Sequence, residues 1–268
     1  MNGSLKITLA VIVVPLMISS CSTVPITGRK QLNLLPESQM LQLSFASYAE
    51  FMKSNKLSDN REASDMVTSV GKDIAAAVQQ YFTENKLTDR LQGYEWEFHL
   101  VQDKTPNAFC MPGGKVVVFE GILPYTQDKN GLAVVLSHEI AHAVARHGNE
   151  RMSQGLIAQF GSVALNELLS KKPDETKAIF NTAYGVGAQY GVMLPFSREH
   201  ELEADKLGLI FMAMAGYDPD TAVAFWERMA QKGGSAPPEF LSTHPSDQTR
   251  INKIKGALPE ARRYYRRK

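Results

Sequence analysis

Residues 138–142, His-Glu-Ile-Ala-His, have the spacing of a metal site with its own base. Histidines four residues apart lie one above the other on a helix face, so two imidazoles can bind one ion from the same side. Zinc suits such ligands, and a catalytic zinc keeps one position open for water. Glu139 flanks the ion, where it can take a proton from that water. The motif predicts hydrolysis, with His138 and His142 as ligands and Glu139 as base.

The surrounding sequence predicts a single helix from Asn130 to Met152. Apolar residues recur at helical spacing, no proline interrupts the segment, and Asn130 can cap its N-terminus. Two packed core histidines beside a surface glutamate would be the purely structural explanation. A third ligand elsewhere in the chain argues against it.

The third ligand in sites of this kind is either a nearby histidine or a glutamate from a later helix. The first arrangement requires HExxHxxGxxH. Ala145 stands at its glycine position and Gly148 at its third histidine position, with His147 one residue early. The sequence therefore favours the second arrangement.

The segment Ser197–Asp205, SREHELEAD, offers this later helix. Glu201 and Asp205 share a face, so Glu201 can bind the metal while Asp205 orients a ligand histidine through its outer N–H. Glu203 points about 200° away from Glu201 around the helix, and we expect it to be solvated or paired. An ordinary charged helix face is the alternative explanation.

Four stretches, HEIAHAVARH, SREHELEAD, NAFCMPGG and LSTHP, together resemble the gluzincin metallopeptidases that include HtpX, the CAAX prenyl endopeptidases and the lipoproteins BepA and LoiP. The mitochondrial inner-membrane stress protease belongs to the same group. The HtpX and CAAX branches have several membrane spans, and the lipoprotein branch fits this sequence better. The resemblance covers about Pro36 to Leu258. It implies one zinc ion per chain, catalytic Glu139, a supporting Asp205, and the ligands His138, His142 and Glu201.

His244 lies in Ser242-Thr243-His244-Pro245, just before a predicted helix from Pro245 to Gly256. A helix N-terminus disfavours protonated imidazole, so a neutral His244 could donate to the oxyanion of a tetrahedral intermediate. It could also occupy the open zinc position and hold the enzyme inactive until substrate displaces it. A third possibility is a helix-capping histidine, and the sequence leaves all three open.

The N-terminus has the parts of an export signal. Ile7–Met17 is an apolar run too short to span a bilayer comfortably. Residues 18–21, Ile-Ser-Ser-Cys, resemble the bacterial lipoprotein box, in which cleavage precedes a cysteine that then carries acyl chains. Ser22 stands where an inner-membrane retention signal tends to have aspartate. We therefore expect lipidation of Cys21 and anchorage to the bacterial outer membrane, facing the periplasm.

The expected organisation is a signal peptide (1–20), a lipidated tether (21–36) and a metallopeptidase domain (37–268). Hydrophobic residues make up 44% of the chain, enough for a sizeable core, and the net charge of +1 gives no electrostatic case for nucleic acid. With Cys21 acylated, Cys110 has no cysteine to pair with, and we expect it to be a small packed hydrophobe.

The pattern of elements predicts an α+β, mainly helical, zincin-like domain with a small antiparallel sheet beside the metal helix. Helices are expected over Glu37–Lys53, Ala63–Phe82 and Thr221–Lys232, and strands over Tyr94–Gln102 and Lys115–Glu120, with a turn at Pro112-Gly113-Gly114. In similar enzymes an edge strand beside the zinc helix binds substrate as an added strand. Our candidates for that strand are Val116, Val117, Val118 and Phe119.

One further segment, Ala178–Phe196, contains no charged residue. Its length alone would permit a membrane span, but its polar residues and glycines argue against one. We expect a buried or lid helix near the active site, with a membrane-touching segment as the alternative.

The predicted function is that of a membrane-anchored zinc endopeptidase that hydrolyses unfolded or misassembled envelope proteins in quality control. Its partners would be unfolded envelope polypeptides, the membrane through the N-terminal lipid, and the outer-membrane assembly machinery. The alternative is a chaperone-like assembly factor for outer-membrane proteins in which proteolysis is secondary. The sequence favours catalysis, because a pure binding module would have no need of Glu139.

Overall fold

The computed structural model describes residues 21–160, 173–184, 197–232, 240–241, 244 and 248–267. The expected signal peptide lies outside these residues, as does the part of the expected lid segment from 185 to 196. Among the described residues no helix is both long and apolar enough to cross a membrane.

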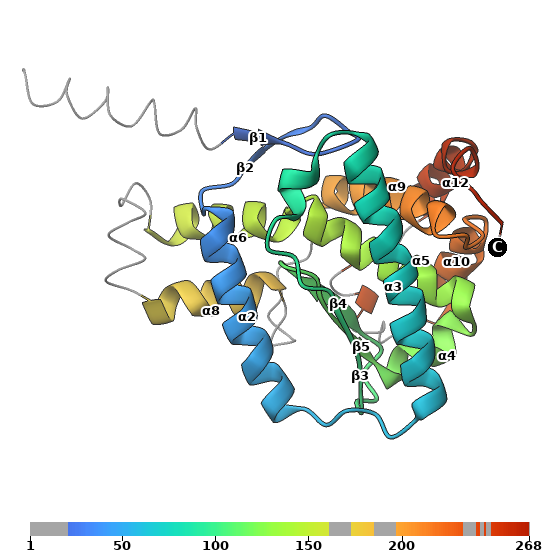
Figure 1. Cartoon of the computed structure of the whole chain (residues 1–268), viewed down its shortest axis with the longest axis horizontal. Helices are drawn as coiled ribbons and strands as arrows, with labels where there is room; N and C mark the ends of the chain where they lie inside the picture. Colours follow the sequence, from blue (N-terminus) through green and yellow to red (C-terminus); the bar gives the residue numbers. More distant parts are fainter. Residues whose placement is uncertain are drawn as a thin grey trace, which may run out of the picture.

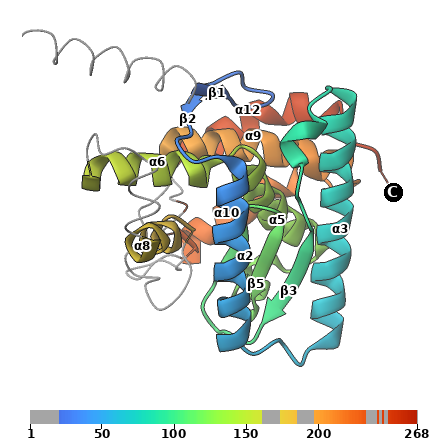
Figure 2. The same cartoon turned by 60° about the vertical axis from the view of Figure 1, so that its left-hand side comes forward.

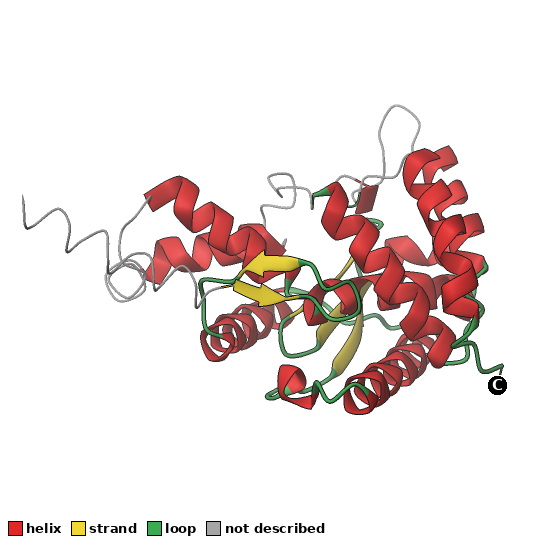
Figure 3. Ribbon diagram, turned by 90° about the horizontal axis from the view of Figure 1, so that it is seen from above, coloured by secondary structure: helices red, strands yellow, loops and turns green. Residues whose placement is uncertain are grey.

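Helices make up most of the fold and surround the strands (Figures 1 and 3). The chain is therefore mainly helical α+β, as the sequence predicts. The helices are α2 (Glu37–Ser54), α3 (Arg61–Glu84), α4 (Leu123–Thr126), α5 (Lys129–Val144), α6 (His147–Phe160), α8 (Pro173–Tyr184), α9 (Arg198–Met214), α10 (Thr221–Lys232) and α12 (Gln248–Arg262), with short 3-10 turns η1 (Thr88–Leu91) and η2 (Glu120–Ile122).

The central sheet has three strands in the order β3 (Glu97–Val101), β5 (Lys115–Phe119) and β4 (Ala108–Met111). β4 and β5 form an antiparallel hairpin, whereas β3 and β5 are parallel, so the sheet is mixed rather than wholly antiparallel. The predicted turn is present. Gly113 and Gly114 both have positive φ values, +82° and +83°, which glycine adopts without steric cost.

Both faces of this sheet are buried. Figure 2 shows the sheet between α2 and α3. Val116 and Val118 of β5 pack in the core formed with α3, α5, α9, α10 and α12, whereas Val117 and Phe119 pack in the core formed with α2, α6 and α8. The uninterrupted apolar run in β5 follows from this burial on two sides.

The segment predicted as a tether is instead folded against the domain. Its strands β1 (Cys21–Thr23) and β2 (Lys30–Leu32) pair as an antiparallel hairpin, which lies at the upper end of the molecule in Figure 1. Asn149 and Ser153 of α6 hydrogen-bond to the chain just after β2, at the carbonyl of Leu35 and the N–H of Leu34.

The predicted helix of Asn130 to Met152 is in fact two helices. Arg146 adopts a left-handed conformation with φ of 62°, which ends α5 and starts α6 in a new direction. The N-cap prediction is also wrong, because the Asp128 side chain accepts from Gly131 N–H at 2.8 Å. The side chain of Asn130 accepts instead from the N–H of Asp218, at 3.0 Å.

Candidate metal centre

Two helices packed along each other, α5 and α9, carry most of the polar side chains of the site. Ser197 caps the N-terminus of α9, and its hydroxyl accepts from the N–H of His200. The two helices approach closely at Gly208. A Cβ added there would lie 3.1 Å from main-chain atoms of Ser137 and His138. This close approach brings Glu201 of α9 within reach of the histidines of α5.

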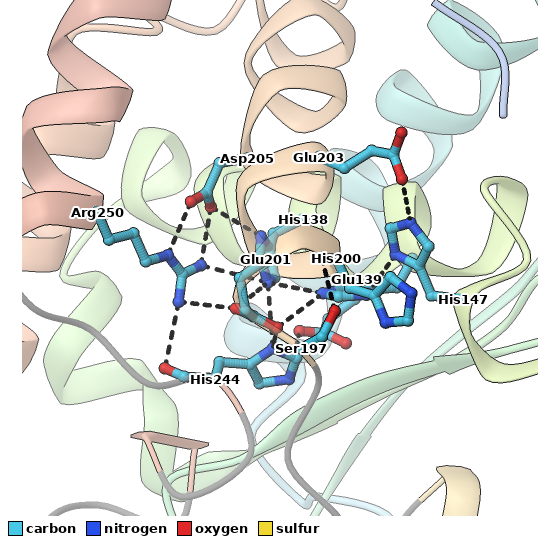
Figure 4. Close-up of polar contacts among 11 residues, drawn as sticks. His138, Glu139, His147, Ser197, His200, Glu201, Glu203, Asp205, His244 and Arg250 are labelled. Atoms are coloured by element: carbon cyan, nitrogen blue, oxygen red, sulfur yellow. Dashed lines mark hydrogen bonds and ion pairs between the residues drawn. The ribbon is translucent and has the colours of Figure 1, made fainter. Parts of the chain in front are cut away.

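Four side chains converge in the interior between these helices (Figure 4). The Nε2 atoms of His138 and His142 are 3.0 Å apart. The Glu201 carboxylate lies 3.4 Å from His138 Nε2 and 3.3 Å from His142 Nε2. His244 Nδ1 lies 3.2 Å from His138 Nε2 and 3.0 Å from Glu201 Oε1. All four side chains are buried.

These separations, 3.0 to 3.4 Å, are close to those around a tetrahedral zinc ion, and one ligand atom from each side chain lies within 4.8 Å of the others. Metal–ligand bonds of about 2.0–2.1 Å place neighbouring ligand atoms of a tetrahedron about 3.3 Å apart. Three imidazole nitrogens and one carboxylate are also donors that zinc accepts. The four side chains therefore form a metal-binding cluster typical of zinc metallopeptidases.

The charges in the cluster also favour a cation. Burial disfavours the protonated form of His138, but the carboxylates of Glu201 and Asp205 outweigh it and raise the pKa of His138 to about 9. Burial lowers the pKa of His142 well below its ordinary value. Because a metal binds the unprotonated nitrogen, a divalent ion would displace the proton from His138.

Asp205 lies where the sequence placed it, behind a ligand histidine. Its Oδ1 is 3.0 Å from Nδ1 of His138, the nitrogen that faces away from the cluster. The sequence did not identify the partner of this carboxylate, Arg250 of α12. Arg250 contacts Asp205 through Nε at 2.7 Å and Nη2 at 2.8 Å, and Nη1 contacts Glu201 at 2.7 Å. This buried arginine holds the two carboxylates of α9 in place.

Glu139 is buried next to the cluster, and burial raises its pKa above the ordinary range. Its Oε1 lies 3.3 Å from Nε2 of His244. One ring of His244 therefore contacts the expected base with one nitrogen and the expected ligands with the other. Of its three expected roles, this geometry favours occupation of the fourth metal position. The flanking residues 242–243 and 245–247 lie outside the described part of the chain.

Two further predictions concern neighbouring residues, and one of them is wrong. Glu203 is buried and paired with His147, at 3.0 Å, so of the two alternatives given for it pairing is correct. The predicted substrate strand is wrong. Val116–Phe119 belong to the central strand, whose main chain pairs with β3 on one side and β4 on the other. A substrate strand cannot be added there.

Comparison with known proteins agrees with this geometry. A sequence profile of peptidase family M48 matches residues 67–258, which include the whole cluster. The chain belongs to peptidase family M48. This chain is 43% identical over 169 residues to the mitochondrial metalloendopeptidase OMA1 of Schizosaccharomyces pombe, an alignment that covers 62% of this chain and 48% of the relative. The gluzincin resemblance seen in the sequence is thus confirmed.

Two further relatives show the range of similarity. The human mitochondrial metalloendopeptidase OMA1 is 33% identical over 248 residues, covering 88% of this chain and 46% of the relative. The beta-barrel assembly-enhancing protease of Yersinia pestis is 31% identical over 166 residues, covering 59% and 33%. The chain spans about half the length of these two OMA1 relatives, and both are more similar to it in identity than the Yersinia protein is.

Proposed function

We propose that this M48 chain is a zinc-dependent endopeptidase. One observation supports this most strongly. His138, His142 and Glu201 present donors at tetrahedral spacing, and Glu139 lies beside them as a buried carboxylate. Bound zinc would polarise the scissile carbonyl and acidify the attacking water.

Glu139 would act as general base and then as general acid. Its carboxylate takes the proton of the attacking water and later gives it to the leaving amine. Burial favours this cycle because it raises the pKa of Glu139 toward the working pH. Asp205 keeps His138 in the tautomer that leaves Nε2 free for the metal.

His244 would hold the resting enzyme inactive. Its ring contacts both Glu139 and the ligand cluster, so an incoming peptide has to displace it. The centre of the neighbouring Phe240 ring lies 4.6 Å from the centre of the His244 ring.

Substrate would bind along β4 instead of the central strand. β4 is the edge strand that packs against α5, and no strand among the described residues pairs with its second edge. Main-chain hydrogen bonds to an edge strand give affinity with little dependence on sequence, which suits unfolded substrates.

We further propose that this endopeptidase is anchored by lipid and acts in the bacterial envelope. The lipoprotein box ending at Cys21 supports the anchor. The name of the Yersinia relative, beta-barrel assembly-enhancing protease, supports envelope quality control, and the greater similarity to the mitochondrial relatives weighs against it. Replacing Cys21 by serine and measuring the membrane-bound fraction tests the anchor.

The test of catalysis compares Glu139→Gln with wild type on an unfolded protein substrate, with zinc content measured for both. We expect both to bind zinc and only the wild type to cleave. Cleavage by the zinc-loaded variant would overturn the mechanism. If neither cleaves but both suppress aggregation of the substrate, the chaperone-like alternative is correct.

A further inference from the structure

The outer nitrogen of His142 contacts another histidine. His142 Nδ1 and His147 Nδ1 are 2.9 Å apart, and Nε2 of His147 lies 3.0 Å from the carboxylate of Glu203 (Figure 4). The side chain of His147 is completely buried. The change of direction at Arg146 positions His147 beside His142 although it lies in the next helix.

Metal binding would fix the direction of the hydrogen bonds from His142 to His147 and from His147 to Glu203. If His142 binds the ion through Nε2, its Nδ1 carries the proton and donates to Nδ1 of His147. Nε2 of His147 then carries the remaining proton and donates to Glu203. This order rests on the proposed zinc site.

The N-terminal hairpin contacts Glu203, the last residue of this series. Arg29, in the loop between β1 and β2, donates from Nε to Glu203 at 2.8 Å, and the hydroxyl of Thr27 donates to the same carboxylate. The Arg29 guanidinium also contacts Glu150 of α6 through both terminal nitrogens, at 3.0 and 2.8 Å. Glu150 accepts in turn from His200 at 3.0 Å.

These contacts parallel those behind the other ligand. His138 is supported by Asp205, which is paired with Arg250 near the C-terminal end of the chain. His142 is supported by His147 and Glu203, which is paired with Arg29 near the N-terminal end. Each of these two histidines thus has a carboxylate behind it, directly for His138 and through His147 for His142. Buried Arg250 neutralises the first carboxylate and partly buried Arg29 the second.

We propose that His147, Glu203 and Arg29 are positioning residues for His142, through which docking of the N-terminal hairpin raises the metal affinity of the centre. The segment that the sequence marks as leading to the membrane would then contribute directly to the metal site. Partners of this kind typically change metal affinity 10- to 100-fold, about the size of effect expected here.

The experiment measures zinc affinity of the full chain by competition with a chelator, and the absorption spectrum of the cobalt-substituted protein. Glu203→Gln keeps the size of the side chain and an acceptor oxygen but removes the charge. We expect its zinc affinity to fall about 10- to 100-fold with shifted cobalt bands. Arg29→Gln should weaken affinity in the same direction, and Arg29→Lys should restore part of it.

The matched control is Arg90→Gln. Arg90 donates to the carbonyl of Thr23 in the same hairpin, at 2.7 Å, but does not contact Glu203 or His147. We expect unchanged zinc affinity and an unchanged cobalt spectrum in this variant. A loss equal to that of Arg29→Gln would overturn the proposal, because docking of the hairpin would then act on the metal by a route other than Arg29, Glu203 and His147.

Unfolding of the metal-free proteins separates positioning from simple stabilisation. The proposal is overturned if Glu203→Gln and Arg29→Gln lower the unfolding midpoint while zinc affinity and cobalt bands stay as in wild type. If Glu203→Gln does not fold, the comparison of Arg29→Gln with Arg29→Lys decides. Failure of the wild type to bind zinc would instead overturn the proposed function, and this inference with it.

Discussion

Nη1 of Arg250 lies 2.7 Å from Glu201, the carboxylate that the sequence assigns to the metal. The same guanidinium contacts both oxygens of Asp205, and its carbon lies 3.7 Å from the centre of the Trp226 ring. This buried cation therefore offsets part of the charge of two buried carboxylates that would otherwise repel each other.

The first prediction concerns this arginine. Replacing Arg250 by leucine leaves Glu201 and Asp205 buried without their cation, and should lower the free energy of unfolding by about 3–5 kcal/mol. Urea unfolding of the metal-free protein measures this. The control is Arg262→Leu on the same helix, which removes an exposed pair with Asp220 and should change stability little. Equal effects of the two variants would contradict the role given to Arg250.

The second prediction compares two glycines in helices. Gly208→Ala inserts a Cβ 3.1 Å from main-chain atoms of α5, so it should destabilise the fold by about 1–3 kcal/mol and weaken zinc binding. Gly256→Ala in α12 meets no atom within 4 Å and should stabilise by about 0.5–1 kcal/mol. Urea unfolding and chelator competition measure both effects. Unchanged zinc affinity in Gly208→Ala would show that the helix spacing does not set the site.

The site residues that could be predicted from the sequence are those whose relative positions follow from the periodicity of a single helix. His138 and His142 share a face because they are four residues apart in one helix, and the same argument places Glu201 and Asp205 together on α9. Only the meeting of the two helices had to be assumed. The gluzincin resemblance supplied that assumption, and the structure brings the four side chains together.

Features that depend on contacts distant in sequence were missed. Nothing in the residues around Arg250 marks it, because the two carboxylates that it pairs with are 45 or more positions away. The break at Arg146 involves no glycine or proline, the usual signals that end a helix. The substrate strand was placed wrongly because the order of strands in the sheet does not follow from the sequence, and β5 lies in the centre. The continuous apolar run of Val116–Phe119 is nevertheless typical of a strand buried on both faces.

The third prediction is loss of stability in acid through the contacts around Arg29. Burial raises the pKa of Glu150, but hydrogen bonds from His200 and Arg29 outweigh it and lower that pKa to about 2. The unfolded value is about 4.3, so this stabilisation is present above pH 4.3 and is lost as the pH falls toward 2. His147 adds to the loss at higher pH. Burial lowers its pKa to about 4, and the unfolded chain therefore binds its proton first as the pH falls from about 6.5.

Urea midpoints of the metal-free protein measured from pH 7 to pH 2 check this dependence. The midpoint should fall in two ranges, the first below pH 6.5 and the second below pH 4.3. In Glu150→Gln the fall in the second range should be smaller, because the group that titrates there is gone. If the midpoint of Glu150→Gln fell as steeply as that of wild type below pH 4.3, Glu150 would not be the source of this part of the stability.

The last prediction separates the three roles considered for His244. Its Nδ1 lies among the metal donors and its Nε2 lies 3.3 Å from Glu139, so in the proposed mechanism substrate has to displace this ring. His244→Ala should therefore raise the initial rate of cleavage of an unfolded substrate, with zinc content retained. Lost turnover with zinc retained would instead indicate oxyanion donation, because a donor used only in the transition state affects the rate and not the metal. An unchanged rate with a lower unfolding midpoint would leave His244 the role of a helix cap.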